Sequence, residues 1–213
     1  MLIYIFASGP NQNNLKSEIT QKVPDLIVAA DGGANHCLDV GILPDIVVGD
    51  LDSISETSRA NLPPKQVEII KFPTRKDATD LELALDLAME KGGNQIVIFA
   101  GLGGRWDMSF SNVMLAASEK YKEMHVSLSA ENSHLHILHA NRKLALRGKS
   151  GQTISLIPLS QEAKGITLSG FEYPLKNETI QFGNSRGLSN VLEKNEGYIT
   201  LSAGTLLCVH ETI

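Results

Sequence analysis

The sequence predicts an α/β fold, in which an N-terminal Rossmann-like domain with a parallel sheet is followed by a small all-β sandwich domain. Two observations carry this prediction. Up to about residue 130, nearly continuous apolar runs alternate with helix-like stretches, which is typical of parallel strands covered by helices. Beyond that point, short alternating segments are separated by turns rich in Gly, Asn, Pro and Ser, as in antiparallel sheets. We therefore expect domains at residues 1–130 and 131–213.

Apolar runs supply the expected strands of the first domain, namely LIYIFAS, LIVAA, PDIVVGD, VEIIKF, QIVIFA and HVSLSA. Helices are expected between them at residues 80–91 and 109–121, because apolar residues there recur on one helical face with charge opposite. A further helix is expected after Gly32 and Gly33. Ligands of βαβ folds bind at the carboxyl ends of the strands, so the loops that follow the strands are expected to carry the chemistry.

The second domain is expected to contain short strands and no helix. The segments are HLHIL, KLALR, QTISLIPL, GITLSG, ETIQF, YITLS and TLLCVH. Turn-forming residues separate them, as in a small antiparallel sandwich. His134, His136 and His139 are interpreted as exposed strand residues, because no carboxylate or cysteine completes a metal site around them.

The composition is that of a folded, soluble chain, since 42% of the 213 residues are hydrophobic and 20% are charged. The net charge of −5, from 19 basic and 24 acidic residues, argues against nucleic acid as a partner. No apolar run reaches the ~20 residues that a membrane helix needs, and the N-terminus lacks a basic segment. We therefore expect no membrane partner and a cytoplasmic location. Cys37 and Cys208 are expected to be buried thiols.

Two pairs of aspartates stand in the loops of the first domain. Asp50 and Asp52 follow the strand DIVV, and Asp77 and Asp80 precede the helix at residues 80–91. Carboxylates gathered in one place stay ionised only beside a cation, and hard oxygen ligands suit Mg²⁺, which also binds substrate phosphates. The alternative is that Asp77 is a helix N-cap, Asp80 a first-turn acid and the other pair turn residues. Two pairs on one rim favour the metal site.

Glycine-rich loops provide a second group of candidates. Gly32 and Gly33 precede a helix, where exposed backbone N–H groups can face an anion. The loop ending at Gly104 is not a P-loop, because no GK[ST] occurs in the chain. It is followed by Arg105, whose planar fork suits phosphate oxygens, and by Asp107. The alternative is a surface Arg–Asp pair in which Asp107 caps a helix. Trp106 is expected to pack behind the site, and the alternative is that it stacks on a base.

The motifs DGGAN, GDLDS, KDATD and GGRWD, followed by GLSN in the β-rich tail, occur in an order that resembles the thiamine pyrophosphokinase family over essentially the whole chain. The resemblance implies a homodimer with an α/β catalytic domain and a β-sandwich domain in each subunit. It also implies transfer of a pyrophosphoryl group from ATP to the hydroxyl of thiamine, with Mg²⁺, giving thiamine diphosphate and AMP. The implied partners are these two small-molecule substrates.

The resemblance further assigns roles to individual residues. It implies metal-binding and catalytic roles for Asp50, Asp52, Asp77 and Asp80, with Arg105 stabilising charge on the phosphates. The ATP site that it implies comprises Asp31, Gly32, Gly33, Asn35, Lys76, Gly104, Arg105 and Asp107. The thiamine contacts that it implies are Tyr173, Ser189 and Asn190. The chain departs from the family at Met108, where many members have histidine, and at Lys76, where glutamine is common.

Alternatives remain open at the level of residues and of function. An aromatic face suits the thiazolium cation, but Tyr173 is equally interpreted as packing on the sandwich. Ser189 and Asn190 suit a pyrimidine edge or an ordinary turn. Asp50-Leu51-Asp52 also matches the DxD metal site of a nucleotide-sugar transferase. A third alternative is a sensor that binds thiamine or a nucleotide without turnover.

Overall fold

The computed structural model describes residues 1–20 and 22–212, and the chain divides into two compact units. Unit 1 comprises Met1–Leu115 and Leu128–Glu131, and unit 2 comprises Ala116–Ser127 and Asn132–Ile213. The units therefore exchange short segments between residues 116 and 131, the stretch in which the domain boundary is predicted. Among the described residues, no helix is both long and apolar enough to cross a membrane.

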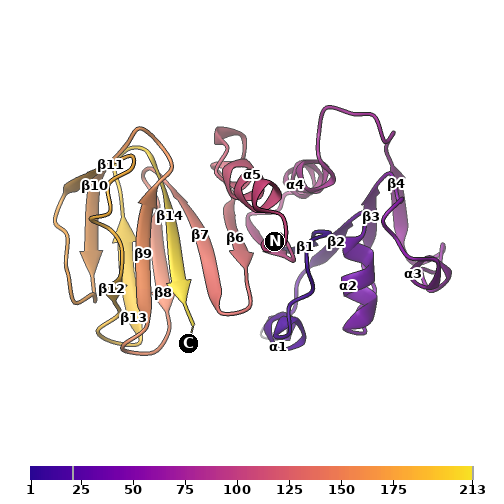
Figure 1. Cartoon of the computed structure of the whole chain (residues 1–213), viewed down its shortest axis with the longest axis horizontal. Coiled ribbons are helices and arrows are strands. Elements are labelled where there is room, and N and C mark those ends of the chain that lie inside the picture. The colour runs from indigo at the N-terminus through magenta and orange to yellow at the C-terminus, as the bar shows by residue number, and fades with distance from the viewer. Residues whose placement is uncertain (21, 213) are drawn as a thin grey trace. The chain divides into compact units, whose positions relative to one another are not determined.

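Unit 1 is built on a parallel sheet (Figure 1). Its strands are β1 (Leu2–Phe6), β2 (Leu26–Ala30), β3 (Ile46–Gly49), β4 (Glu68–Lys71) and β5 (Gln95–Phe99). They lie in the order β4-β3-β2-β1-β5, and each neighbouring pair is parallel. The chain runs outward from β1 to β4 and then returns to β5 on the other side of β1. The point where the strand order reverses, between β1 and β5, is where folds of this class bind their ligands.

Short helices follow most strands of this sheet. They are α1 (Leu15–Ile19), α2 (Gly33–Asp39), α3 (Glu56–Ala60), α4 (Asp80–Glu90), α5 (Trp106–Ala116) and a 3₁₀ turn (Glu119–Tyr121). The predicted helix at residues 80–91 is confirmed as α4, whose N-cap Thr79 accepts a hydrogen bond from the backbone N–H of Glu82. The helix predicted at 109–121 instead begins at Trp106 and ends at Ala116, and the 3₁₀ turn follows it. Neither α1 nor α3 is predicted, because five residues are too few to show a helical period.

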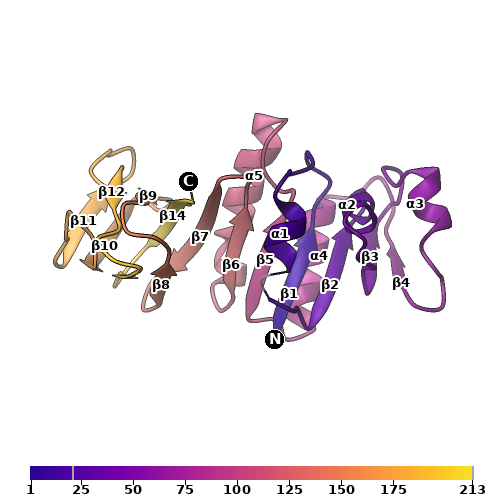
Figure 2. The same cartoon turned by 90° about the horizontal axis from the view of Figure 1, so that it is seen from below.

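Helices cover both faces of the unit 1 sheet (Figure 1, Figure 2). Alternate strand residues such as Phe6 and Val47 form one apolar cluster with Leu15 of α1 and Cys37 of α2. Strand residues of the opposite parity point to the other side, where the buried face of α4 contacts β1, β2 and β3. Burial on both faces explains why β1, β2, β3 and β5 are continuous apolar runs, whereas the edge strand β4 is largely exposed.

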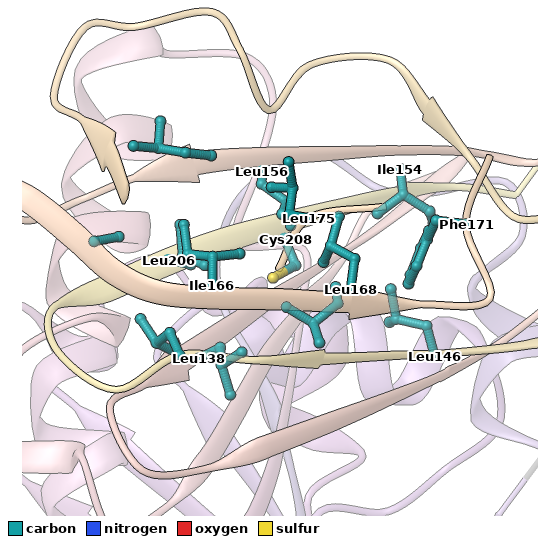
Figure 3. Packing of buried hydrophobic residues seen from close by; sticks show 14 of the residues in the cluster. Leu138, Leu146, Ile154, Leu156, Ile166, Leu168, Phe171, Leu175, Leu206 and Cys208 are labelled. Carbon is teal, nitrogen blue, oxygen red and sulfur yellow. The ribbon is translucent and has the colours of Figure 1, made fainter. Parts of the chain in front are cut away.

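Unit 2 contains two antiparallel sheets packed face to face. The strands are β7 (Ser133–His139), β8 (Lys143–Arg147), β9 (Thr153–Pro158), β10 (Glu162–Ser169), β11 (Glu178–Gln181), β12 (Asn190–Val191), β13 (Glu196–Thr200) and β14 (Thr205–Glu211), while residues of β6 (His125–Ser129) fall in both units. One sheet has the order β12-β9-β14-β7 and the other β11-β10-β13-β8. Between them, Leu138, Leu206 and Cys208 of the first sheet pack with Ile166 and Leu168 of the second (Figure 3). The predicted α/β fold with a small all-β sandwich is thus confirmed.

The histidines of β7 are not exposed, contrary to the prediction. His134 and His136 are half-buried, and His139 is only 5% exposed. His134 and His136 share the parity of the core residue Leu138, and His134 pairs across the strands with the buried His210 of β14. The sequence pattern shows that two histidines share a strand face, but not that this face points into the sandwich.

These histidines make the sandwich sensitive to acid. Burial lowers the pKa of His136 to about 3, and the neighbouring His134 and His210 add repulsion. Oε1 of Gln152 accepts a hydrogen bond from Nε2 of His210. Since the unfolded pKa is about 6.5, the stability held by neutral His136 is present above that pH and is lost as the pH falls toward 3. We expect about 2–3 kcal/mol to be lost by pH 4.5, or roughly 4–12 °C in Tm.

Thermal unfolding of the wild type and of His136→Leu between pH 7.5 and 4.5 measures this contribution. The variant is expected to lose less Tm on acidification than the wild type, because leucine cannot be protonated. Equal slopes in the two proteins would show that His136 does not contribute to the acid sensitivity.

Candidate active site

A cavity of about 630 Å³ opens at the carboxyl end of the unit 1 sheet. Its lining comes from the loops after β1, β2, β3, β4 and β5, namely residues 7–10, 31, 50, 53, 74, 76, 78–81, 101, 103–105, 108 and 112. The loops that the sequence singles out therefore lie on one rim. The cavity includes the ends of β1 and β5, where the strand order reverses, and so occupies the expected ligand position of a doubly wound sheet.

Three carboxylates converge on this rim. One oxygen each of Asp31, Asp50 and Asp52 lies within 4.8 Å of the other two. Asp31 is only 3% exposed and has a left-handed backbone (φ 46°), as does Leu51 (φ 69°) between the other two aspartates. The backbone N–H of Asp52 donates to Oδ1 of Asp50 at 3.2 Å, and this hydrogen bond is the main cause that lowers the pKa of Asp50. The left-handed backbone thus accompanies a group of carboxylate oxygens, a combination typical of functional sites.

Asp80 lies beside this group but is held by a lysine. Its Oδ1 accepts a hydrogen bond from Nζ of Lys76 at 2.7 Å. A side chain at Gly49, where φ is +144°, would place Cβ 2.9 Å from Oδ1 of Asp80 and 3.0 Å from Cβ of Asp31. Gly49 therefore allows the two acidic residues to approach the end of β3 together. Asp77 is exposed and does not line the cavity, and the N-cap of α4 is Thr79 rather than Asp77.

Two predicted nucleotide-binding glycines lie behind the cavity rather than in its lining. Both Gly32 and Gly33 are buried, and a Cβ on Gly33 would stand 1.9 Å from the carbonyl oxygen of Phe6. Gly33 thus permits the close contact of α2 with β1. Asn35 also has a structural role. Its Nδ2 donates to the carbonyl of Ser53, and its Oδ1 accepts from the backbone N–H of Ser55. The Asn35 amide thereby fixes the loop that carries Asp50 and Asp52.

Arg105 and Asp107 form a forked ion pair. Nε of Arg105 donates to Oδ1 of Asp107 at 3.1 Å, and a second hydrogen bond joins the terminal nitrogen to Oδ2. The hydrogen bond from Arg105 is the main cause that lowers the pKa of Asp107. Both side chains are exposed, at 73% and 64%, and Arg105 lines the cavity. An incoming phosphate can take over the guanidinium fork from Asp107, because both offer paired anionic oxygens.

The loop after β1 is part of the site that sequence reasoning missed. Its residues Ser8, Gly9 and Pro10 line the cavity. Gly9 donates its N–H to the carbonyl of Ala100 and accepts at its own carbonyl from Nε2 of His36. The ring of Pro10 lies 3.0 Å from the position of a Cβ on Gly104, which has φ +67°. No charged residue marks this loop, but its position after the first strand of a doubly wound sheet could have found it.

Trp106 contradicts its prediction, because it is 87% exposed rather than packed behind the site. Phe110, one helical turn later on α5, is 71% exposed. Large apolar side chains are usually buried because they avoid water, which is the reason for the prediction. Trp106 and Phe110 of α5 are exceptions.

Unit 2 has its own cavity of about 630 Å³, which brings together all three predicted thiamine contacts. Tyr173 is 59% exposed, and a hydrogen bond with Glu172 is the main cause that raises the pKa of Tyr173. Oδ1 of Asn190 accepts from the N–H groups of Tyr173 and Val191, and its Nδ2 donates to the carbonyl of Tyr173. Ser189 has a left-handed backbone (φ 57°). The amide of Asn190 therefore fixes the backbone of Tyr173, because both of its polar atoms are hydrogen-bonded to that backbone.

Known proteins match this chain along its length. The model of the thiamin pyrophosphokinase catalytic domain matches residues 19–128, and the model of the thiamin pyrophosphokinase vitamin B1 binding domain matches residues 135–206. Thiamine pyrophosphokinase of Bacillus subtilis (strain 168) is 32% identical over 99% of this chain and 98% of that protein.

Solved structures and a more distant relative extend the comparison. A crystal structure of thiamine pyrophosphokinase from Bacillus subtilis superposes with a TM-score of 0.85 at 30% identity, covering 100% of this chain and 99% of that chain. A 6-hydroxymethyl-7,8-dihydropterin pyrophosphokinase of Pyrococcus furiosus is 29% identical over 49% of this chain and 58% of that protein. Two family models and a relative aligned over nearly its whole length agree, and the chain therefore belongs to the thiamin pyrophosphokinase family.

Proposed function

We propose that this chain is an ATP-dependent thiamine pyrophosphokinase, which transfers the pyrophosphoryl group of ATP to the hydroxyl of thiamine and releases AMP. The observation that carries the proposal is the group of three carboxylates, Asp31, Asp50 and Asp52, on the rim of a cavity that also presents Lys76 and Arg105. Acidic and basic groups together suit a metal-bound polyphosphate, which carries both a cation and anionic oxygens.

The donor set fits Mg²⁺. Carboxylate oxygens are its preferred protein ligands, and the buried Asp31 lies close enough to Asp50 and Asp52 to need a cation between them. We assign these three residues to the metal: Asp31 and Asp50 line the cavity, and Asp52 lies within reach of both. Asp80 also lines the cavity, whereas Asp77 belongs neither to the lining nor to the carboxylate group. When bound, the metal would neutralise negative charge on the phosphates.

The residues of the chain would then orient the two reactants. Arg105 would exchange Asp107 for phosphate oxygens and stabilise charge on the transferred group. The hydroxyl oxygen of thiamine forms a bond to the β-phosphorus as the bond from that phosphorus to the α-phosphate oxygen breaks, and AMP leaves. A carboxylate of the cavity would accept the hydroxyl proton. Backbone groups of Ser8 and Gly9 lie where they can border the nucleotide.

The cavity of unit 2 is assigned to thiamine. The exposed ring of Tyr173 offers a face to the thiazolium cation, and Ser189 borders the same cavity. Asn190 serves this site by fixing the backbone of Tyr173.

We also propose the homodimer and the cytoplasmic location that the resemblance and the sequence predict. Light scattering is expected to give twice the chain mass of 23.1 kDa, and a value equal to that mass would contradict the dimer.

Release of AMP in the presence of defined acceptors tests the proposed function. AMP is expected with ATP, Mg²⁺ and thiamine together, and not when thiamine is left out or when EDTA removes the metal. The match to a pterin pyrophosphokinase makes 6-hydroxymethyl-7,8-dihydropterin the most informative alternative acceptor. Turnover with the pterin but not with thiamine would contradict the proposal, as would turnover of a nucleotide sugar. Binding of both substrates without any product would indicate a sensor.

Replacing Tyr173 with alanine is expected to raise the KM for thiamine by roughly 2- to 30-fold, because a cation–π contact contributes about 0.5–2 kcal/mol. The KM for ATP should not change. Steady-state kinetics with each substrate varied in turn measures both values. Tyr173→Phe is the matched control, since it keeps the ring and loses only the hydroxyl. An equal increase in both KM values would exclude Tyr173 as the platform for thiamine.

A further inference from the structure

We propose that Lys76 is a resident cation of the acidic cavity, which opposes binding of a bare divalent ion and favours entry of the metal together with the nucleotide. This inference rests on the proposed function. The role belongs to the free protein, before either substrate binds.

The first observation is the contact itself. Nζ of Lys76 lies 2.7 Å from Oδ1 of Asp80, and the two side chains are only 14% and 28% exposed. A lysine ammonium is strongly hydrated in water, so a position this far from solvent is stable only beside compensating negative charge. Asp80 supplies that charge, and its place at the start of α4 stabilises the carboxylate further.

The second observation is how close this pair lies to the carboxylate group. Oδ1 of Asp80 and Cβ of Asp31 both lie against Gly49, because a Cβ on this glycine would stand 2.9 Å from the first and 3.0 Å from the second. Lys76 also lines the same cavity as Asp50, a member of the carboxylate group. The positive charge of Lys76 therefore acts on the oxygens that are assigned to the metal.

Arg105, the other basic side chain of the cavity lining, does not compensate the charge of the carboxylate group. Arg105 is engaged by the fork of Asp107 and is largely exposed. Of the two basic side chains in this lining, Lys76 is therefore the one paired with a carboxylate of the acidic group's own rim, Asp80.

The consequence is a coupling between metal and nucleotide. A divalent ion that enters alone meets the repulsion of the ammonium, whereas a nucleotide brings negative charge and offers phosphate oxygens as new partners for Lys76. Loss of the lysine charge should therefore tighten binding of the bare ion, and should not tighten binding of the metal–nucleotide complex.

Binding of Mn²⁺ to the free protein, followed by electron paramagnetic resonance, tests this coupling. Lys76→Gln is expected to bind Mn²⁺ alone roughly tenfold more tightly than the wild type, since one unit charge is removed close to the site. Arg75→Gln is the matched control: it removes the same charge one residue away, from an exposed side chain outside the cavity lining, and should change the affinity less than twofold. Lys76→Arg keeps the charge and should bind Mn²⁺ like the wild type.

A second titration uses Mn²⁺ with α,β-methylene-ATP, in which the bond to be broken is blocked. Lys76→Gln is expected to bind this complex no more tightly than the wild type. Unchanged or weaker binding of the bare ion by Lys76→Gln would overturn the inference, as would equal tightening for the ion and the complex. In either case the proposed function stands if the wild type binds the complex. If the wild type does not bind Mn²⁺ even with the nucleotide analogue, both proposals fail.

Discussion

Replacing Asp50 with asparagine is expected to lower kcat for thiamine diphosphate formation by about 10²–10³-fold, because the change removes a negative charge from the site that must hold the metal and the phosphates. The fold should remain intact. Asparagine keeps an oxygen that can accept the hydrogen bond from the N–H of Asp52, and relief of repulsion from two nearby carboxylates offsets the lost charge, so Tm should change little. Steady-state kinetics over a range of Mg²⁺ concentrations, together with thermal unfolding, measures both effects.

Asp39→Asn is the control for this change. Asp39 ends α2 and is exposed, and it does not line the cavity. The control should keep the kcat of the wild type. Activity of Asp50→Asn within threefold of the wild type at saturating Mg²⁺ would remove Asp50 from the metal site.

Replacing Arg105 with alanine is expected to lower kcat by about 10³-fold, a loss typical of a positioned arginine in phosphoryl transfer. Little change in Tm is expected, since Arg105 is exposed and its ion pair with Asp107 is accessible to solvent. Arg105→Lys should recover only part of the loss, because an ammonium cannot reproduce the planar fork. Single-turnover kinetics separates the chemical step from substrate binding.

Arg147→Ala is the matched control for Arg105. Arg147 is likewise an exposed arginine in an ion pair, with Glu196, but it belongs to the outer surface of unit 2. Its replacement should leave kcat unchanged. Should Arg105→Ala raise only the KM for ATP at constant kcat, Arg105 would be a ground-state binding residue rather than one that stabilises the transition state.

The strands and longer helices of this protein could be predicted because the local spacing of apolar residues shows which of their faces are buried. Strands buried on both faces are continuous apolar runs, and α4 repeats its apolar residues with a helical period. The same reasoning failed where burial depends on distant partners. His139, predicted to be exposed, is buried with its ring beside Thr205 of β14, and Trp106 is exposed although its residue type favours burial.

The candidate site was predictable in its location more than in its internal contacts. Loops after parallel strands meet at one edge, so Asp50, Asp80 and Arg105 could be expected to line one cavity. That Asp31 joins the carboxylates depends on its left-handed backbone and on Gly49, which no spacing rule reveals. The amide of Asn190 likewise binds the backbone of Tyr173, a contact across 17 residues that sequence alone does not show.

The fate of the β-phosphate is the most direct test of the proposed reaction. ATP labelled at the β-phosphorus is incubated with thiamine, Mg²⁺ and the protein, and the products are separated by chromatography. The account predicts that the label appears in thiamine diphosphate and that AMP is released without label. Label retained in ADP, with thiamine monophosphate as the other product, would show transfer of the γ-phosphoryl group instead and would contradict the account.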